Sequence, residues 1–160
     1  RLMDAQQALP TLAIALIVAV LLEPSTRNVV VLLAVAGWVN YARLLRGETF
    51  ALREQEFVQG AVALGASSVG VIARHIIPNL LKSTTVIATV EVGRMVLLEA
   101  SLSFLGFGIQ PPTPSVGAMI RSAQSYIFEA PWLGIVPGAL LLLLVVAVNQ
   151  IGDKLIEGKR

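Results

Sequence analysis

The chain has 160 residues, of which 56% are hydrophobic and 14% are charged, and its mean hydropathy is +0.78. A soluble domain carries about a quarter charged residues, so this composition indicates a membrane protein. The sequence has no cysteine and one histidine, which excludes disulfides, thiolate catalysis and an imidazole-rich metal site. The net charge of +2 comes from scattered basic residues without a basic patch, so no nucleic-acid partner is expected.

Four apolar segments are predicted to span a bilayer as helices, and the expected fold is an all-α, polytopic transmembrane bundle forming one domain. The spans are expected at residues 5–22, 29–46, 79–107 and 132–152. The first is short, because a helix needs roughly 20 apolar residues to cross hydrocarbon. The second ends in aromatic and basic residues, as is typical of a membrane interface, and the fourth carries no charge before Asp153.

Basic residues fall unequally on the two sides of this predicted bundle. With four spans, both chain ends and residues 52–78 share one side, and residues 108–131 form the main loop on the other. Nine Lys and Arg residues lie on the first side, against only Arg27 and Arg121 on the second. The positive-inside rule therefore predicts that both ends of this chain and residues 52–78 are cytoplasmic. On the outer side, Ser115 is expected to cap a short surface helix.

Residues 57–81 read FVQGAVALGASSVGVIARHIIPNLL, and they are too polar to span a bilayer yet rich in helix formers. Residues 52–64 are predicted to form one short helix with Phe57, Ala61 and Leu64 on a single face. Gly65 can take the left-handed conformation that ends a helix. The pattern therefore predicts a helix followed by a tight turn.

A second short helix is expected to begin at a cap formed by Ser67 or Ser68. It would carry Arg74 and His75 near its C-terminal end, and Pro78 would then open the third span, where a missing N–H costs nothing. An alternative interpretation is an amphipathic loop that lies on the inner leaflet. Its apolar side consists largely of Ala and Gly, however, and such a surface suits docking into a protein groove better than membrane anchoring.

This loop resembles the signature loop of binding-protein-dependent ABC importer permeases of bacteria and archaea. Their pattern is Glu-Ala-Ala, three residues, Gly, nine residues, Ile, one residue and Leu-Pro. Here the same spacing places Gln59-Gly60-Ala61, then Gly65, then His75-Ile76-Ile77-Pro78, so that Gln59 replaces the acid and Gly60 the first Ala. His75 at its position is similar to the dipeptide, oligopeptide and nickel branch of the family. A second block agrees with that branch: LEASLSFLGFG at residues 98–108, followed by QPPTPS at residues 110–115.

The resemblance implies a permease with six spans, of which this chain contains the last four, so the chain is expected to be the C-terminal portion of a longer protein. Two permease copies or homologues would form the pore in the inner membrane. Two cytoplasmic ATP-binding subunits and an external solute-binding protein would complete the importer. The resemblance assigns contact with the ATP-binding subunit to Phe57, Gln59, Gly60, Ala61, Leu64, Gly65, Ser67, Arg74, His75 and Pro78.

The third span contains three ionisable residues, Glu91, Arg94 and Glu99, which the helical period places on one broad face. Such a side chain inside a bilayer costs several kcal/mol unless it is paired or hydrated, so it is a functional candidate. Glu91 and Arg94 are spaced to pair within the helix. One interpretation is a structural ion pair. The other is that this face lines the translocation path, which the hydroxyl groups of the same span favour: Thr84, Thr85, Thr89, Ser101 and Ser103.

The sequence contains no catalytic constellation, phosphate-binding loop or cofactor motif, so ATP hydrolysis is expected in a separate partner subunit. We therefore predict a permease subunit of an ATP-driven importer for peptides or a related small solute. The alternative is a membrane scaffold or regulatory anchor that recruits a cytoplasmic partner without moving a solute. A scaffold has no need for a charged, hydroxyl-rich span, and an autonomous channel has no need for the grooved cytoplasmic loop.

Overall fold

The computed structural model describes residues 2–22 and 25–157, which form helices and turns with no strand among them. Arg1, Lys159 and Arg160, which contribute to the predicted charge asymmetry, lie outside the described residues. The all-α class predicted from the sequence is confirmed. In chain order the elements are α1 (Leu2–Gln7), α2 (Thr11–Leu21), α3 (Thr26–Arg53), α4 (Glu56–Ala63), α5 (Ser68–Val71), η1 (Ile72–Ile76), α6 (Ile77–Leu105), α7 (Val116–Ala123), η2 (Gln124–Tyr126) and α8 (Trp132–Glu157).

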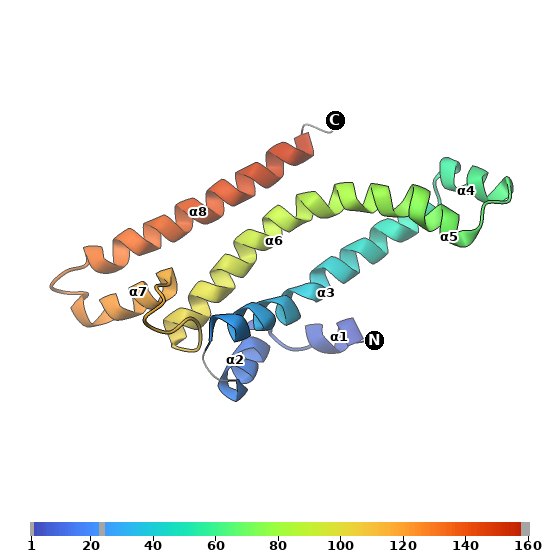
Figure 1. Ribbon diagram of the computed structural model, residues 1–160. Coiled ribbons are helices and arrows are strands. Elements are labelled where there is room, and N and C mark those ends of the chain that lie inside the picture. The colour runs from blue at the N-terminus through green and yellow to red at the C-terminus, as the bar shows by residue number, and fades with distance from the viewer. Residues whose placement is uncertain (1, 23–24, 158–160) are drawn as a thin grey trace.

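Three long helices, α3, α6 and α8, form the body of the structure, and α6 lies between the other two (Figure 1). By length and composition, two of the described helices can cross a membrane, Thr26–Arg53 and Trp132–Lys154. The helix predicted as the third span, α6, is 29 residues long and carries ionisable side chains in its middle. The long helices thus include three of the four predicted spans.

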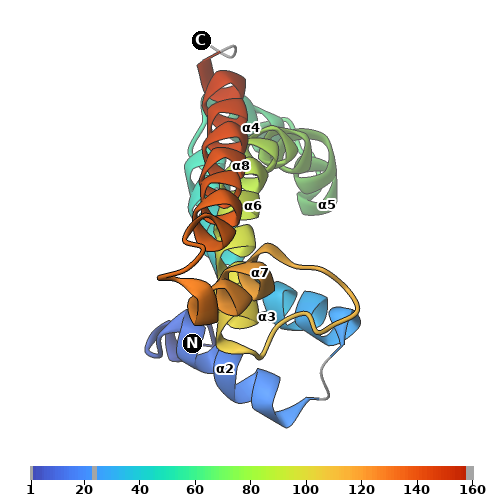
Figure 2. The same cartoon turned by 90° about the vertical axis from the view of Figure 1, so that its left-hand side faces the viewer.

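The prediction of one continuous helix over residues 5–22 is wrong. The chain forms α1, a turn and then α2, because Pro10 has no N–H and restricts the residue before it to extended conformations. With 11 residues, α2 is about 16 Å long, or roughly half of the hydrocarbon thickness. It lies across the ends of α3 and α6 (Figures 1 and 2), where Ala15 packs with Leu32 and Leu102.

The second predicted span, residues 29–46, is the middle of a longer helix. Ser25 caps α3, since its Oγ accepts a hydrogen bond from the backbone N–H of Asn28 at 3.1 Å. At the other end the helix continues to Arg53, which extends it by about 10 Å beyond residue 46. The end of α3 therefore projects toward α4 and helps to build the loop that follows.

The two long connections lie at opposite ends of the bundle (Figure 1). One end holds α4 and α5, and the other holds α7 with the proline-rich link that precedes it. The predicted cap of α7 is confirmed, because Ser115 Oγ accepts from the backbone N–H of Ala118 at 3.1 Å. Connections predicted for opposite sides of a membrane are thus separated by the full length of the long helices.

Gly117 lies where α7 packs on α6, and a Cβ at this position would overlap the backbone carbonyl of Ala100. We expect Gly117→Ala to push α7 away from α6 and to lower the free energy of unfolding by about 1–3 kcal/mol, the usual cost of overpacking. The measurement is the thermal unfolding midpoint of the purified protein in detergent. Gly138→Ala in α8 is the matched control, because its Cβ would meet open space. Equal midpoints for the two variants would contradict the tight α6–α7 contact.

Candidate functional site

The connection between α3 and α6 folds around the tight turn predicted at Gly65. This glycine has a φ of 86°, and its N–H donates to Val62 O at 2.9 Å. The next N–H, of Ala66, donates to Ala61 O at 3.0 Å, which completes a Schellman motif at the end of α4. Ser67 then caps α5, accepting from the backbone N–H of Gly70 at 3.2 Å. The predicted roles of Gly65 and Ser67 in the backbone are confirmed.

The second short helix does not end near Arg74 and His75, as the sequence predicted. It continues through the π-helical turn η1 directly into α6. Pro78 explains the π-helical winding. In a regular α-helix the Pro78 ring would clash with the carbonyl of Arg74, and Pro78 has no N–H to donate to that carbonyl. Asn79 supplies a further donor, with Nδ2 bonding to His75 O at 2.7 Å. One helical rod therefore runs from Ser68 to Leu105.

A small apolar core joins α4 to this rod. Val58 from α4 is buried against Val71, which directly precedes η1, and Ile76, the last residue of η1. Ala61 packs against the same core, so it faces inward, whereas a partner-facing position was predicted for it. Gly60 is exposed, and a Cβ there would meet no atom within 4 Å. The small-residue face of α4 is therefore divided between the internal core and the surface.

The outer surface of the loop is apolar and open. Leu64 is 92% exposed and Phe57 is 46% exposed, with the Phe57 ring tilted against His75 at 6.0 Å between centroids. Gln59 is exposed but bonds back to the chain, since its Nε2 donates to Glu54 O at 3.2 Å. Arg74 and Pro78 are exposed as well. The predicted contact residues thus gather at one end of the bundle, with Ala61 directed inward.

A groove of about 520 Å³ runs between the end of α3, α4 and the α5–η1 segment. The contribution of Thr49 and Arg53 to this groove was not predicted from the sequence, because the second span was expected to end at residue 46. The strong helix formers that follow Gly47 were the available signal. The groove is lined by Thr49, Arg53, Val58, Gln59, Val62, Ala66, Ser68, Val71, Ile72 and Ile76.

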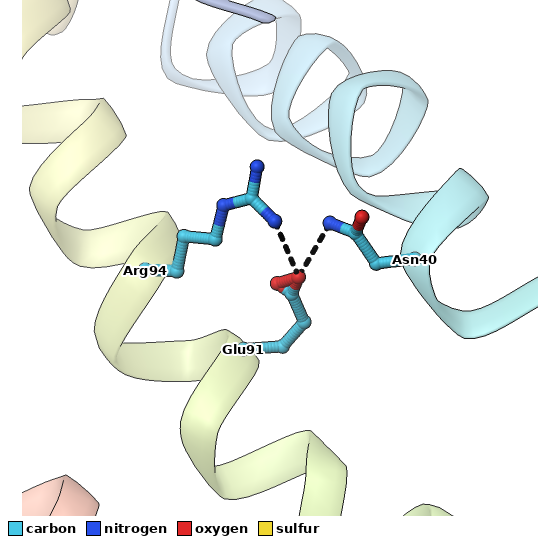
Figure 3. A network of polar contacts seen from close by, with 3 residues as sticks. All are labelled: Asn40, Glu91 and Arg94. Atoms are coloured by element: carbon cyan, nitrogen blue, oxygen red, sulfur yellow. Dashed lines mark hydrogen bonds and ion pairs between the residues drawn. The ribbon is translucent and has the colours of Figure 1, made fainter. Parts of the chain in front are cut away.

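A polar cluster around the buried carboxylate of Glu91 lies near the middle of α3 and α6 (Figure 3). Glu91 is only 5% exposed, and its Oε1 accepts from Asn40 Nδ2 at 2.6 Å and from Arg94 Nη1 at 3.3 Å. Glu91 Oε2 is buried and has no hydrogen-bond partner among the described residues. The predicted pairing of Glu91 with Arg94 is confirmed, and Asn40 adds a hydrogen bond between α3 and α6.

Glu99 belongs to a different cluster from Glu91 and Arg94. Its Oε1 accepts from Ser103 Oγ at 2.6 Å, and Ser103 Oγ in turn accepts from the backbone N–H of Ile109 at 3.0 Å. This chain ties the end of α6 to the link that follows it. The helical spacing predicted that Glu99 shares a face of α6 with Glu91 and Arg94. The hydrogen bond from Ser103 instead directs the Glu99 carboxylate toward the end of the helix.

Three hydroxyl groups of α6 donate to carbonyl groups of their own helix. Thr84 Oγ1 bonds to Leu80 O at 2.7 Å, and the hydroxyls of Thr85 and Ser101 bond in the same way, four residues back. Such bonds satisfy a hydroxyl inside an apolar environment. These side chains are therefore weaker indicators of a polar path than the sequence suggested, and Glu91 and Arg94 become the stronger ones.

The described residues form a helical bundle in which two helices are long and apolar enough to cross a membrane, as in an all-α membrane protein. The chain belongs to the family of binding-protein-dependent transport system inner membrane components, whose family model matches residues 1–159. This is a family of membrane transport permeases, and not of enzymes.

Curated relatives agree with the family match. The chain is 37% identical, over 155 residues, to the glutathione transport system permease protein GsiD of Escherichia coli O1:K1. It has the same identity to the protein of that name from Shigella flexneri serotype 5b. Each alignment covers 97% of this chain and 51% of the relative, so the chain spans about half the length of the curated relatives it matches.

Replacement of Asn40 tests the buried cluster. Asn40→Leu keeps the branching at Cγ, with a larger side chain, and leaves Glu91 with Arg94 as its remaining described partner. An unsatisfied buried acceptor costs about 1–3 kcal/mol, so the thermal unfolding midpoint should fall clearly below that of the parent. Gln150→Leu, at an exposed position of α8, is the control and should leave the midpoint nearly unchanged. An Asn40→Leu midpoint equal to that of the parent would show that the interhelical bond adds no stability.

Proposed function

We propose that this chain is part of the transmembrane permease subunit of an ATP-driven importer. The observation that carries the proposal is the helical rod from Ser68 to Leu105, which joins the exposed loop to the buried cluster. From the start of α6, Glu91 lies about 21 Å along the helix at 1.5 Å per residue. A rod of this kind suits a protein in which movement of a loop must reach residues inside the membrane.

The loop is the proposed contact with a cytoplasmic ATP-binding subunit. Its surface offers the exposed apolar side chains of Phe57 and Leu64 beside the groove that runs along α4. The Schellman turn at Gly65 and the core around Val58 give this surface a defined shape. Gln59, Gly60, Ser67, Arg74, His75 and Pro78 belong to the same proposed contact region. A shaped apolar surface at one end of the bundle fits a protein groove better than a mobile linker would.

The face of α6 that carries Glu91 and Arg94 is the proposed wall of the translocation path. We assign Glu99 to holding the link after α6, since its carboxylate bonds to Ser103. A peptide-like solute is the proposed cargo, because the relatives that match this chain are named as glutathione transport permeases. A second permease subunit and an external solute-binding protein complete the proposed assembly. A membrane scaffold is the weaker proposal, because it leaves the cluster in α6 without a use.

Thiol labelling tests the proposed orientation. The chain has no cysteine, so Ala66→Cys and Thr113→Cys each introduce one exposed thiol, at opposite ends of the bundle. In intact cells, an impermeant maleimide should modify position 113 and not position 66. After permeabilisation both positions should react. Labelling of position 66 alone in intact cells would reverse the orientation.

Substitution of Gly65 tests the coupling role of the loop. A β-branched residue at a φ of 86° costs about 1–3 kcal/mol of backbone strain, although its Cβ would meet open space. In the assembled transporter, Gly65→Val should leave membrane insertion intact, and should reduce copurification of the ATP-binding subunit or uncouple ATP hydrolysis from uptake. Gly47→Val in α3 is the control, because it adds the same side chain at an open helical position. Parental copurification and uptake in the Gly65 variant would remove the loop from the coupling path.

A further inference from the structure

We propose that a cavity beside the Glu91–Arg94 pair binds a carboxylate group of the transported solute, with Arg94 as the principal donor. The inference rests on the proposed transport function and gives it a specific binding site. The cavity has a volume of about 330 Å³ and lies between α1, the turn before α2, α3 and α6. Five of its lining residues carry polar side chains: Gln6, Gln7, Thr11, Asn40 and Arg94.

Arg94 presents unused donors to this cavity. Its side chain is 51% exposed, and its contacts within the described part of the chain use only Nη1, which bonds to Glu91. A guanidinium has five N–H donors in a planar fork. Two parallel N–H groups match the two oxygens of a carboxylate, in a geometry that an ammonium group cannot offer. The free edge of Arg94 can therefore bind a carboxylate while the pair with Glu91 stays intact.

Glu91 is a positioning residue for this site. Its carboxylate is held by Asn40 of α3 at 2.6 Å, so both long helices fix its place. The 3.3 Å contact to Nη1 then limits the orientations of the guanidinium, whose remaining edge faces away from Glu91 (Figure 3). The negative charge of Glu91 also offsets the positive charge of Arg94. Affinity for an anion stays moderate as a result, which suits a site from which the solute must leave again.

The interruption between α1 and α2 contributes to the lining of the cavity. Pro10 and Thr11 line the cavity at the first turn of α2, and this helix start has no side-chain cap. The first turn of a helix carries unpaired N–H groups and a partial positive charge. Non-helical backbone at membrane depth is stable where it is buried in protein or lines a polar cavity. The break at Pro10, which contradicts the predicted continuous span, thus fits the wall of an anion site.

Two further polar side chains of the lining, Gln6 and Gln7, come from α1. Gln6 joins α1 to α3, with Nε2 donating to Val35 O and Oε1 accepting from Trp38 Nε1, both at 2.9 Å. Gln7 follows on the same wall and is exposed. Among the described residues, none that line the cavity is acidic. The site offers one free edge of the Arg94 guanidinium, next to the negative charge of Glu91. This arrangement suits a singly charged carboxylate better than a doubly charged phosphate.

The test compares two solutes that differ only in the proposed ligand group. The assembled importer is reconstituted in vesicles with its binding protein, and ATP-dependent uptake of a labelled tripeptide is measured beside that of its C-terminal amide. Arg94→Gln should lower the ratio of carboxylate to amide uptake by about tenfold, as expected for loss of one charge-assisted hydrogen-bonded pair. Arg94→Lys should give an intermediate ratio, because it keeps the charge and loses the fork.

A second variant leaves the buried cluster untouched. Gln7→Glu places a negative charge in the cavity and should also lower the carboxylate-to-amide ratio. Arg27→Gln, at an exposed position outside the cavity, is the control and should keep the parental ratio. The external binding protein is the same throughout, so a changed ratio reports on this chain.

The outcomes separate the two proposals. Parental ratios in both the Arg94→Gln and Gln7→Glu transporters would overturn the carboxylate site and leave the transport function standing. An equal loss for both solutes, with assembly intact, would also overturn it and give Arg94 a structural role. If Arg94→Gln does not assemble, the ratio of the Gln7→Glu transporter decides. Absence of ATP-dependent uptake in the parent would overturn the proposed function and the site together.

Discussion

The burial of the Glu91 carboxylate between α3 and α6 constrains the rest of the structure. A buried carboxylate is stable only while its hydrogen-bond partners stay in place. Asn40 reaches it at 2.6 Å in one register of α3 against α6, and Arg94 reaches it from one turn further along α6. The two helices are therefore fixed to each other near their midpoints. Because each helix is 28 or 29 residues long, the connections attached to their two ends lie at opposite ends of the bundle (Figure 1).

The other side of α6 is held by a different kind of interaction. Against α8 the contact depends on small residues, since a Cβ at Gly93 would lie 3.1 Å from Asn149 Oδ1 and one at Gly152 would overlap Thr89. Close packing of this kind drives helix association in a bilayer, where lipid is as apolar as a leucine side chain. Displacement of α6 must therefore carry α3 with it or break the bond from Asn40, and it must also move α8 or disturb this close packing.

Short-range chemistry explains which features could be predicted from the sequence. The turn at Gly65, the cap at Ser67 and the pairing of Glu91 with Arg94 each depend on residues within one or two helical turns, so residue type and spacing sufficed. Pro10 also indicates a helix break, but the apolar content of residues 5–22 favoured one continuous span. The contact of Gln6 with α3 spans 29 residues of sequence, and no local pattern encodes it. The cavity beside Arg94 was missed for the same reason.

The π-helical turn η1 decides how the loop and the buried cluster are connected. A proline at position 78 would ordinarily end the helix, which would leave the loop hinged to α6. The wider winding of η1 and the bond from Asn79 to His75 O keep the helix continuous instead. Val71, just before η1, and Ile76, the last residue of η1, both pack against Val58 of α4. Because α4 contacts both the start and the end of this turn, a force on α4 acts on the turn and on the rod that continues from it. The rod is in turn bonded to α3 at Glu91, so the same helix connects the proposed ATP-binding-subunit contact with the wall of the proposed carboxylate site.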